Sequence, residues 1–136
     1  MNTSQEKQTV EDMMVAEVVT ISPMAKLREA MELMRDRNIK SLVVERRSGS
    51  DAWGMLTYTM LLRTIVHEEG DIDLINVYDI AAKPALSVPR QLDIRQAVSM
   101  MLQIGVKRLI VTSNNELEGI LTMNDIIGAI LDKMAT

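Results

Sequence analysis

The chain has 136 residues, 47% of them hydrophobic and 25% charged, with a formal net charge of −4. This length favours one domain with its own core, and the acidic balance argues against nucleic-acid binding, which requires a basic surface. The lack of cysteine excludes disulfides and thiolate chemistry and favours a cytoplasmic location. No apolar run approaches the length of a membrane span, so we expect no membrane partner.

The first half of the chain predicts strands that alternate with helices. Leu27, Ala30, Met31 and Met34 follow the i, i+3, i+4, i+7 spacing of an amphipathic helix, which Arg37-Asn38 closes. The predicted order is a disordered polar lead-in at 1–9, a short segment at 10–14, a β-rich run at 16–21, this helix, a strand at 41–44, a hairpin loop at 46–51, a return strand at 52–57 and a second helix at 59–67.

An acidic linker at 68–76 separates this half from a second one with the same order. A strand at 85–88 ends at Pro89, and Asp93 with Gln96 predicts a capping box before the next helix. The remaining predicted elements are a helix with an apolar stripe at Ile94, Ala97, Val98 and Met101, a strand at 109–112, a tight turn at 113–115, a return strand at 117–121 and a closing helix at 124–134.

The two halves repeat each other in sequence. Residues 27–34 (LREAMELM) and 39–44 (IKSLVV) return 67 positions later as 94–101 (IRQAVSMM) and 106–111 (VKRLIV). The stretch 54–57 (GMLT) returns 65 positions later as 119–122 (GILT). Two copies are too few for a solenoid. They predict one pseudo-twofold domain of two βαββα units, and clefts between packed halves are common ligand sites.

These motifs resemble the CBS domain, a small module that occurs in tandem pairs called Bateman modules. The most specific stretch is 119–125 (GILTMND), which matches the Gly-hydrophobic-x-Ser/Thr-x-x-Asp nucleotide motif of that family. The resemblance implies an α/β fold: two βαββα CBS repeats related by a pseudo-twofold axis, with two small sheets and four main helices. We expect the repeats at 10–67 and 77–134, forming one CBS-pair domain.

Thr122 and Asp125 are the main candidate ligand residues. A helix that starts about two residues after Thr122 presents free N–H groups and a positive dipole end, which suit a phosphate. The Thr122 hydroxyl could donate to a phosphate oxygen, and Asp125 could accept from both ribose hydroxyls. In the family this aspartate holds the ribose, so the resemblance implies that role for Asp125. The alternative is that both residues only cap their helix.

The first repeat departs from this motif, because Met60 stands where aspartate is expected. A thioether cannot hold a ribose diol, so we expect two unequal clefts. The cleft with Asp125 is the predicted nucleotide site. The other, with Met55, Thr57 and Leu86, is expected to be empty, weaker or adapted to a ligand without ribose.

The resemblance also implies that each cleft borrows residues from the opposite repeat. Val18, Val19, Ile39 and Ile120 would line a flat adenine base with aliphatic side chains, or the two valines could be ordinary core. Lys40 and Lys107 stand where the family often places a basic or polar residue near the phosphate, or could be exposed charges. Arg108 follows Lys107, and since side chains alternate along a strand, one of these two should face the cleft.

We expect no catalysis and no metal. His67 is the single histidine, no Ser-His-Asp set or glycine-rich phosphate loop occurs, and the acidic residues follow a solvated pattern. The first hypothesis is a regulatory sensor of AMP, ADP or ATP that signals to an unknown partner protein and needs no cofactor. The alternatives are a module that binds no nucleotide and docks or dimerises through methionine-rich helices, and a sensor of S-adenosylmethionine or NAD. A homodimer is expected in each case.

Overall fold

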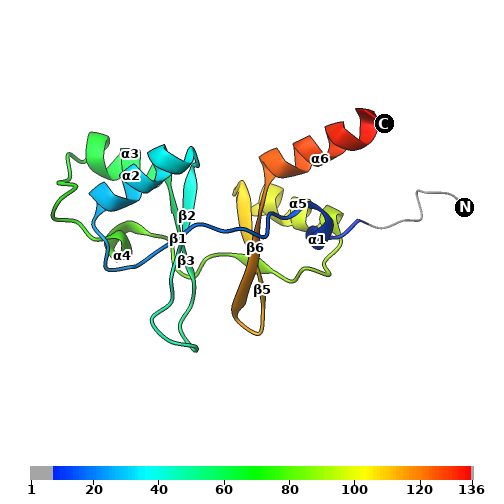
Figure 1. The fold of residues 1–136 in the computed structure, drawn as a ribbon, viewed down its shortest axis with the longest axis horizontal. Helices are drawn as coiled ribbons and strands as arrows, with labels where there is room; N and C mark the ends of the chain where they lie inside the picture. Colours follow the sequence, from blue (N-terminus) through cyan, green and yellow to red (C-terminus); the bar gives the residue numbers. More distant parts are fainter. Residues whose placement is uncertain (1–7, 136) are drawn as a thin grey trace, which may run out of the picture. The chain divides into compact units, whose positions relative to one another are not determined.

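The computed structural model describes residues 8–135, so residues 1–7 of the disordered lead-in predicted at 1–9 lie outside the described residues, whereas Thr9 bridges Asp93 and is ordered. The chain forms two compact units. We call Val18–Ala85 the first-half unit, and the described residues up to Glu17 together with those from Leu86 onward the second-half unit. Figure 1 shows that each unit has its own small sheet and its own helices. The α/β class with a three-stranded sheet in each unit is confirmed.

The first-half unit is built around the sheet β1-β2-β3. β1 pairs with β2 in parallel and β2 pairs with β3 antiparallel, as expected for a strand, a helical crossover and then a hairpin. Asn38, in the left-handed conformation with φ of 55°, ends the first helix as predicted. The elements are β1 (Thr20–Ile21), α2 (Leu27–Arg37), β2 (Ser41–Val44), β3 (Gly54–Thr57), α3 (Tyr58–Leu62), its π-helical continuation η2 (Arg63–His67) and α4 (Val77–Ile80).

The second-half unit repeats this topology with the sheet β4-β5-β6. Again the first pair is parallel and the second antiparallel. Asn114 and Asn115 both have positive φ, which a tight hairpin turn of this kind requires. The elements are α1 (Val10–Met13), β4 (Ser87–Val88), α5 (Ile94–Ile104), β5 (Arg108–Ser113), β6 (Glu116–Thr122) and α6 (Met123–Ala135).

Each unit is completed by a leading segment that starts with a four-residue helix, α1 or α4. Both helices begin with a capping box, formed by Thr9 with Asp12 and by Asn76 with Asp79. The α1 segment belongs to the second-half unit: the Val10 N–H donates to the Leu92 carbonyl at 2.9 Å. The α4 segment correspondingly joins the first-half unit through donation from Val77 N–H to the Ala25 carbonyl at 2.8 Å.

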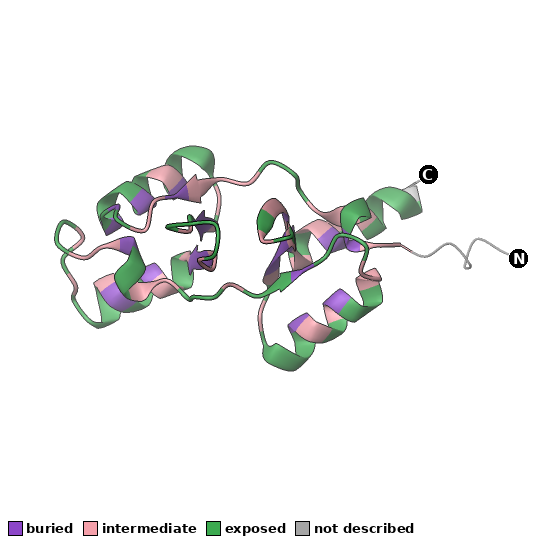
Figure 2. Cartoon of the chain, turned by 90° about the horizontal axis from the view of Figure 1, so that it is seen from below, coloured by how far each residue is buried: buried purple, intermediate pink, exposed green. Residues whose placement is uncertain are grey.

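Each leading segment also adds a short antiparallel bridge to the edge of its sheet. Val15 bridges Ile120 on β6, and Ala82 bridges Met55 on β3. The buried residues in Figure 2 gather on the strands and on the inner helix faces of each unit. The two cores are separate clusters, and the leading helices supply one fully buried valine to each, Val77 in the first and Val10 in the second. Burying apolar area of this kind is the main term that stabilises each unit.

Several predicted elements differ from the observed ones. The β-rich run at 16–21 forms a strand only at Thr20–Ile21, the two residues that have register partners on β2, and Val19 before them contributes a carbonyl that accepts from the Val43 N–H. The predicted capping box of Asp93 with Gln96 is wrong: the Asp93 carboxylate accepts from the Arg95 N–H at 2.8 Å and forms an ion pair with the Arg95 guanidinium at 3.0 Å. The helix predicted at 59–67 begins at Tyr58 and changes to a π-helical turn at Arg63.

Methionine mostly fills the interiors of the two units. Met34, Met55 and Met101 are buried, and most others pack against one of the two cores, as suits a flexible side chain that fills irregular gaps. The exposed apolar residues of α3, η2 and α6 are mainly leucine, valine and isoleucine. A docking surface on these helices would therefore be aliphatic rather than methionine-rich.

Gly119 allows the close approach of the α1 segment to β6. A Cβ built at Gly119 would lie 2.8 Å from the Val15 carbonyl oxygen and 2.9 Å from the Met14 sulfur. Gly119→Ala is therefore expected to destabilise the second-half unit by about 1–3 kcal/mol, measured by urea unfolding. Gly49→Ala is the matched control, because a Cβ there meets nothing within 4 Å. Equal unfolding midpoints for the two variants would contradict this role of Gly119.

Candidate functional site

The turn from β6 into α6 holds a mutually bonded threonine and aspartate. β6 ends at Thr122, and α6 begins at the next residue. The Asp125 N–H donates to the Thr122 hydroxyl oxygen at 3.0 Å, which satisfies one of the unpaired N–H groups of the first helical turn. The Thr122 hydroxyl in turn donates to Oδ2 of Asp125 at 2.8 Å. The threonine therefore caps the helix and also orients the carboxylate.

The carboxylate of Asp125 keeps the capacity to bind further donors. An ionised carboxylate offers about four lone-pair sites, and the bond from Thr122 uses one of them. Asp125 is half-buried, so its carboxylate is fixed by the turn without being sealed from solvent. It stands in the first turn of a 13-residue helix, beside N–H groups that favour an anion. The turn can therefore present a hydroxyl acceptor next to a phosphate-binding helix end.

The equivalent turn of the first-half unit has the same backbone but no carboxylate. The Met60 N–H donates to the Thr57 hydroxyl oxygen at 3.4 Å, as Asp125 does to Thr122. The helix starts in the same way too, since the Tyr58 N–H donates to the Lys40 carbonyl and the Met123 N–H to the Lys107 carbonyl, both at 3.0 Å. Met60 is half-buried and packs against the first-half core. The two turns therefore differ mainly in the ligand group.

Five of the predicted ligand residues come together at the end of the β5-β6 hairpin. Arg108 is the register partner of Thr122, and Ile120 lies two residues before Thr122 on β6. Lys107, exposed, directly precedes β5, and Arg108 is half-buried. Beside Asp125 at the start of α6, the hairpin thus supplies two cationic side chains (Lys107 and Arg108), one aliphatic side chain (Ile120) and one hydroxyl (Thr122). Leu86 lies in the same unit, where its carbonyl accepts from the Ile110 N–H at 2.9 Å.

The other predicted ligand residues lie in the first-half unit. Val18 and Val19 are half-buried, and the Val19 carbonyl accepts from the Val43 N–H at 3.1 Å. Ile39 packs against the first-half core. Lys40 is exposed, with its ammonium 5.9 Å from the centre of the Tyr58 ring. Met55 and Thr57 lie two residues apart on β3. That Val18, Val19, Ile39 and Lys40 join Asp125 in one site stays a prediction.

The sequence predicted a short segment at 10–14, but the reasoning missed its counterpart at α4 and the sheet edges that both leading segments join. Val15 runs beside Ile120, and Ala82 occupies the matching place beside Met55, so both border the candidate ligand residues. The signal was present: Thr9, Val10 and Asp12 return 67 positions later as Asn76, Val77 and Asp79. This is the spacing of the other repeated segments, and both sets form capping boxes.

Residues 8–135, the part of the chain that the structure describes, lack two kinds of feature. None of its helices has the length and apolar character needed to cross a membrane. Within the same residues, no three or more His, Cys, Asp or Glu side chains gather in a way that could hold a metal ion.

The comparisons with known proteins agree with the repeat. The profile of the CBS domain matches residues 10–67 and 77–132. An uncharacterized 33.4 kDa protein in the ribosomal RNA operon of Thermofilum pendens is 34% identical over 130 residues, which are 87% of this chain and 42% of that protein. An uncharacterized protein of Methanopyrus kandleri is 31% identical over 112 residues, which are 82% of this chain and 57% of that protein. The chain thus spans about half the length of these two relatives.

Among solved structures, the hexameric CBS-CP12 protein from bloom-forming cyanobacteria is similar with a TM-score of 0.86 and 27% identity. The match covers 91% of this chain and 72% of that one. Two matches of one domain profile, a repeated strand-helix-hairpin order and a threonine-aspartate turn all describe the same architecture. The chain belongs to the CBS-domain family, and it contains a tandem CBS pair.

Proposed function

We propose that the chain is a regulatory module that senses an adenine nucleotide, AMP, ADP or ATP, at the Thr122–Asp125 turn and signals occupancy to a partner protein. The observation that carries the proposal is the Asp125 carboxylate, which Thr122 holds in the first turn of α6. Its equivalent in the other repeat is Met60, so the proposal assigns the stronger site to Asp125 and a weaker or empty one to Met55, Thr57 and Leu86.

Each part of the nucleotide has a candidate partner. Asp125 would accept from the two ribose hydroxyls, and the start of α6 would receive the phosphate with help from Lys107, Arg108 and Lys40. The apolar surface for the base would come from Ile120, Val18, Val19 and Ile39. Because a ligand shifts a conformational equilibrium only by its difference in affinity for the two states, the signal requires that nucleotide prefers one arrangement of the module. The proposal includes no catalytic step and places the module in the cytoplasm.

The ribose contact gives the sharpest test of this proposal. Calorimetric titration of the protein with AMP and with 2′-deoxy-AMP compares ligands that differ by one hydroxyl. Loss of one hydrogen bond to a charged group costs about 1.5–3 kcal/mol, so the deoxy ligand is expected to bind about tenfold to a hundredfold more weakly. Equal affinities would contradict the assignment of Asp125 to the ribose. S-adenosylmethionine and NAD share the ribose and are the alternative ligands to titrate beside AMP, ADP and ATP.

A second candidate function is docking or dimerisation without a nucleotide. The observation that favours it is the exposure of aliphatic side chains on α3, η2 and α6. These include Leu62, Val66 and Leu131, which are 54%, 68% and 60% exposed. Such surfaces often mark protein-protein contacts. We propose self-association through these helices together with nucleotide binding. A protein that binds none of the adenosine ligands but remains dimeric in light scattering would favour the docking function alone.

A further inference from the structure

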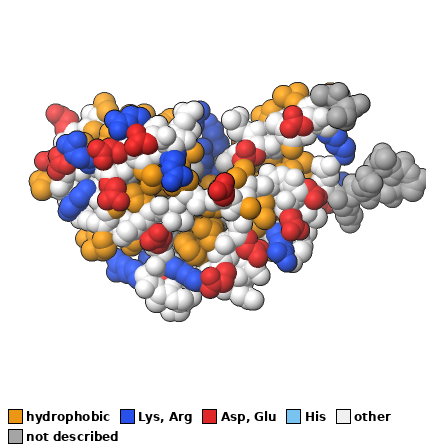
Figure 3. All heavy atoms as spheres, viewed as in Figure 1, with side chains coloured by type: hydrophobic (Ala, Val, Ile, Leu, Met, Phe, Trp, Pro, Cys, Tyr) orange, Lys and Arg blue, Asp and Glu red, His pale blue; other side chains and the backbone are white. Residues whose placement is uncertain are grey.

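The hairpin loop between β2 and β3 carries two arginines that lie over aromatic rings. The Arg46 guanidinium lies 5.0 Å from the centre of the Trp53 ring, and the Arg47 guanidinium lies 5.7 Å from the centre of the Tyr78 ring on α4. Both distances are within the range of a cation–π interaction. Figure 3 shows Lys and Arg side chains beside hydrophobic ones at the surface around this hairpin. The loop and α4 therefore share a surface that is both cationic and aromatic.

Asp51 holds this loop in a defined conformation. Its Oδ2 accepts from the Arg47 N–H at 2.8 Å and from the Lys83 ammonium at 2.9 Å. The Lys83 ammonium, with the Arg47 N–H, lowers the pKa of Asp51 to about 2, so the carboxylate is ionised at neutral pH. Asp51 thus binds the backbone of Arg47 and not its guanidinium, which forms no ion pair with any carboxylate of residues 8–135. The loop presents that guanidinium to solvent.

Exposed apolar side chains border the two arginines. Met24 and Tyr78 are 60% and 46% exposed. Their segments lie side by side, because the Tyr78 N–H donates to the Pro23 carbonyl at 3.0 Å and the Asn76 side-chain amide to the Met24 carbonyl at 2.7 Å. The hairpin surface, as we call it, consists of Met24, Arg46, Arg47, Trp53 and Tyr78. All five residues belong to the first-half unit, so the surface is formed within one compact unit.

The second repeat has none of these five side chains. Its residues at the equivalent positions, 65 or 67 places away, are Glu11, Gln91, Ser113, Asn114 and Glu118. All of them are polar, and none is cationic, aromatic or apolar. The second-half unit nevertheless has the same sheet topology, so the fold does not require the arginines, the rings or the methionine at this place. An exposed apolar and cationic surface that one repeat alone carries indicates a binding role.

We propose that the hairpin surface binds an acidic segment of a partner protein that carries aliphatic side chains next to its carboxylates. The Arg47 guanidinium would form a two-bonded pair with a glutamate or aspartate of that segment, and Met24 and Tyr78 would contact the aliphatic side chain beside it. A protein segment is favoured over nucleic acid, because the net charge of −4 opposes a polyanion outside this small patch. The inference rests on the proposed function only for the existence of a partner protein.

Tryptophan fluorescence measures binding at the hairpin surface, because Trp53 is the single tryptophan of the chain. The probe is a synthetic peptide of alternating glutamate and leucine, and the glutamine-leucine peptide is its neutral counterpart. We expect the emission of Trp53 to change with the acidic peptide only, with an affinity that falls as salt is added. Arg47→Glu should weaken this binding at least about tenfold, since attraction at this position becomes repulsion.

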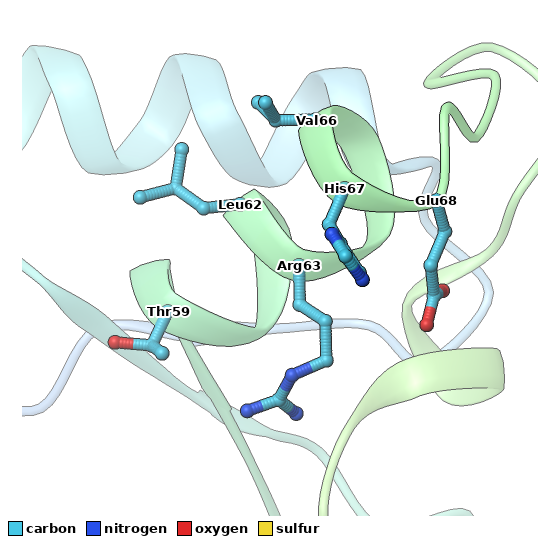
Figure 4. A pocket seen from close by; sticks show the side chains of 6 residues that line it. All are labelled: Thr59, Leu62, Arg63, Val66, His67 and Glu68. Atoms are coloured by element: carbon cyan, nitrogen blue, oxygen red, sulfur yellow. The ribbon is translucent and has the colours of Figure 1, made fainter.

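Arg63→Glu is the matched control, because it makes the same change of charge in the same unit. Arg63 lines a different depression, on α3 and η2, together with Thr59, Leu62, Val66, His67 and Glu68 (Figure 4). None of these residues belongs to the hairpin surface, so Arg63→Glu should bind the acidic peptide with wild-type affinity. An equal loss in both variants would show a dependence on overall charge and would overturn the proposal.

Three further results would also overturn it. These are no emission change with the acidic peptide, equal affinities of wild type and Arg47→Glu, and tighter binding of poly(U) RNA than of the peptide. An emission change on concentrating the protein alone, lost in Arg47→Glu, would assign the surface to a second copy instead. Calorimetry with AMP separates this test from the sensor proposal: Arg47→Glu should leave AMP affinity unchanged, and a protein without nucleotide affinity could still bind the peptide.

Discussion

Replacing Asp125 with alanine is expected to weaken nucleotide binding about a hundredfold. The carboxylate would accept two ribose hydroxyls, and hydrogen bonds to a charged group contribute about 1.5–3 kcal/mol each. A loss of about 3 kcal/mol corresponds to about two decades in the dissociation constant. The variant should also lose discrimination between AMP and 2′-deoxy-AMP, because the group that reads the diol is gone. Calorimetric titration of both ligands against wild type and variant measures both effects.

Met60→Ala is the matched control for this experiment. Met60 occupies the same place in the turn of the first repeat, where its N–H donates to the Thr57 hydroxyl. It packs against the first-half core, so its loss lowers stability somewhat, but nucleotide affinity should change less than about threefold. Thermal melts without ligand show that each variant is folded. A similar loss of affinity in both variants, or none in Asp125→Ala, would remove Asp125 from the proposed site.

Replacing Val10 with aspartate is expected to unfold the second-half unit. Val10 is fully buried in the second-half core, although it lies at the start of the chain, 76 residues before Leu86. Its N–H also donates to the Leu92 carbonyl, so both the side chain and the backbone of Val10 contact the second-half unit. An uncompensated charge in a core costs about 3–5 kcal/mol, a large fraction of the stability of a small domain.

Amide hydrogen exchange locates this effect. Val10→Asp should reduce protection in α5, β5 and β6 before it reduces protection in α2, β2 and β3, since the α1 segment packs with the second-half unit. Glu11→Ala, at an exposed position of the same helix, should leave protection unchanged. Faster exchange first in β2 and β3 would show that the α1 segment supports the other unit instead.

Much of the fold follows from local signals that the two repeats share. The strand at 41–44 has the predicted bounds, because a short apolar run between a helix end and a hairpin loop has few alternatives. Asn38 and Gly105 end α2 and α5 in the left-handed conformation, at equivalent positions of the two repeats. The long closing helix begins one residue before its predicted start. In these elements, periodicity and capping residues point to the same answer.

Elements that depend on distant contacts were harder to predict. α1 and α4 have four residues each, too few for a helical period, and they are stabilised by capping boxes and by packing against the sheets they join. β1 is short because Thr20 and Ile21 alone pair with β2 in its parallel ladder. A parallel pairing lacks the turn signal that marks a hairpin, so its register cannot be read from the local sequence.

The candidate site, like the fold, could be predicted from the sequence only in part. The motif at 119–125 identified Thr122 and Asp125, and the departure at Met60, directly from residue types. The hydrogen bond in which the Thr122 hydroxyl donates to Asp125 was not predicted, since a hydroxyl rotates to whichever acceptor lies near it. This bond gives Thr122 a role in capping α6 and orienting the carboxylate, and its donation to a phosphate oxygen stays a prediction.

A thermal-shift comparison of wild type and Asp125→Ala with AMP, ADP, ATP, S-adenosylmethionine and NAD tests the central claim most directly. A ligand at a hundredfold excess over its dissociation constant stabilises the folded protein by about 2.7 kcal/mol. For a domain of this size that raises the melting temperature by roughly 5–15 °C. We predict such a shift with at least one of AMP, ADP and ATP in wild type and little or none in Asp125→Ala. No shift with any adenine nucleotide, or equal shifts in the two proteins, would contradict a nucleotide sensor at Asp125.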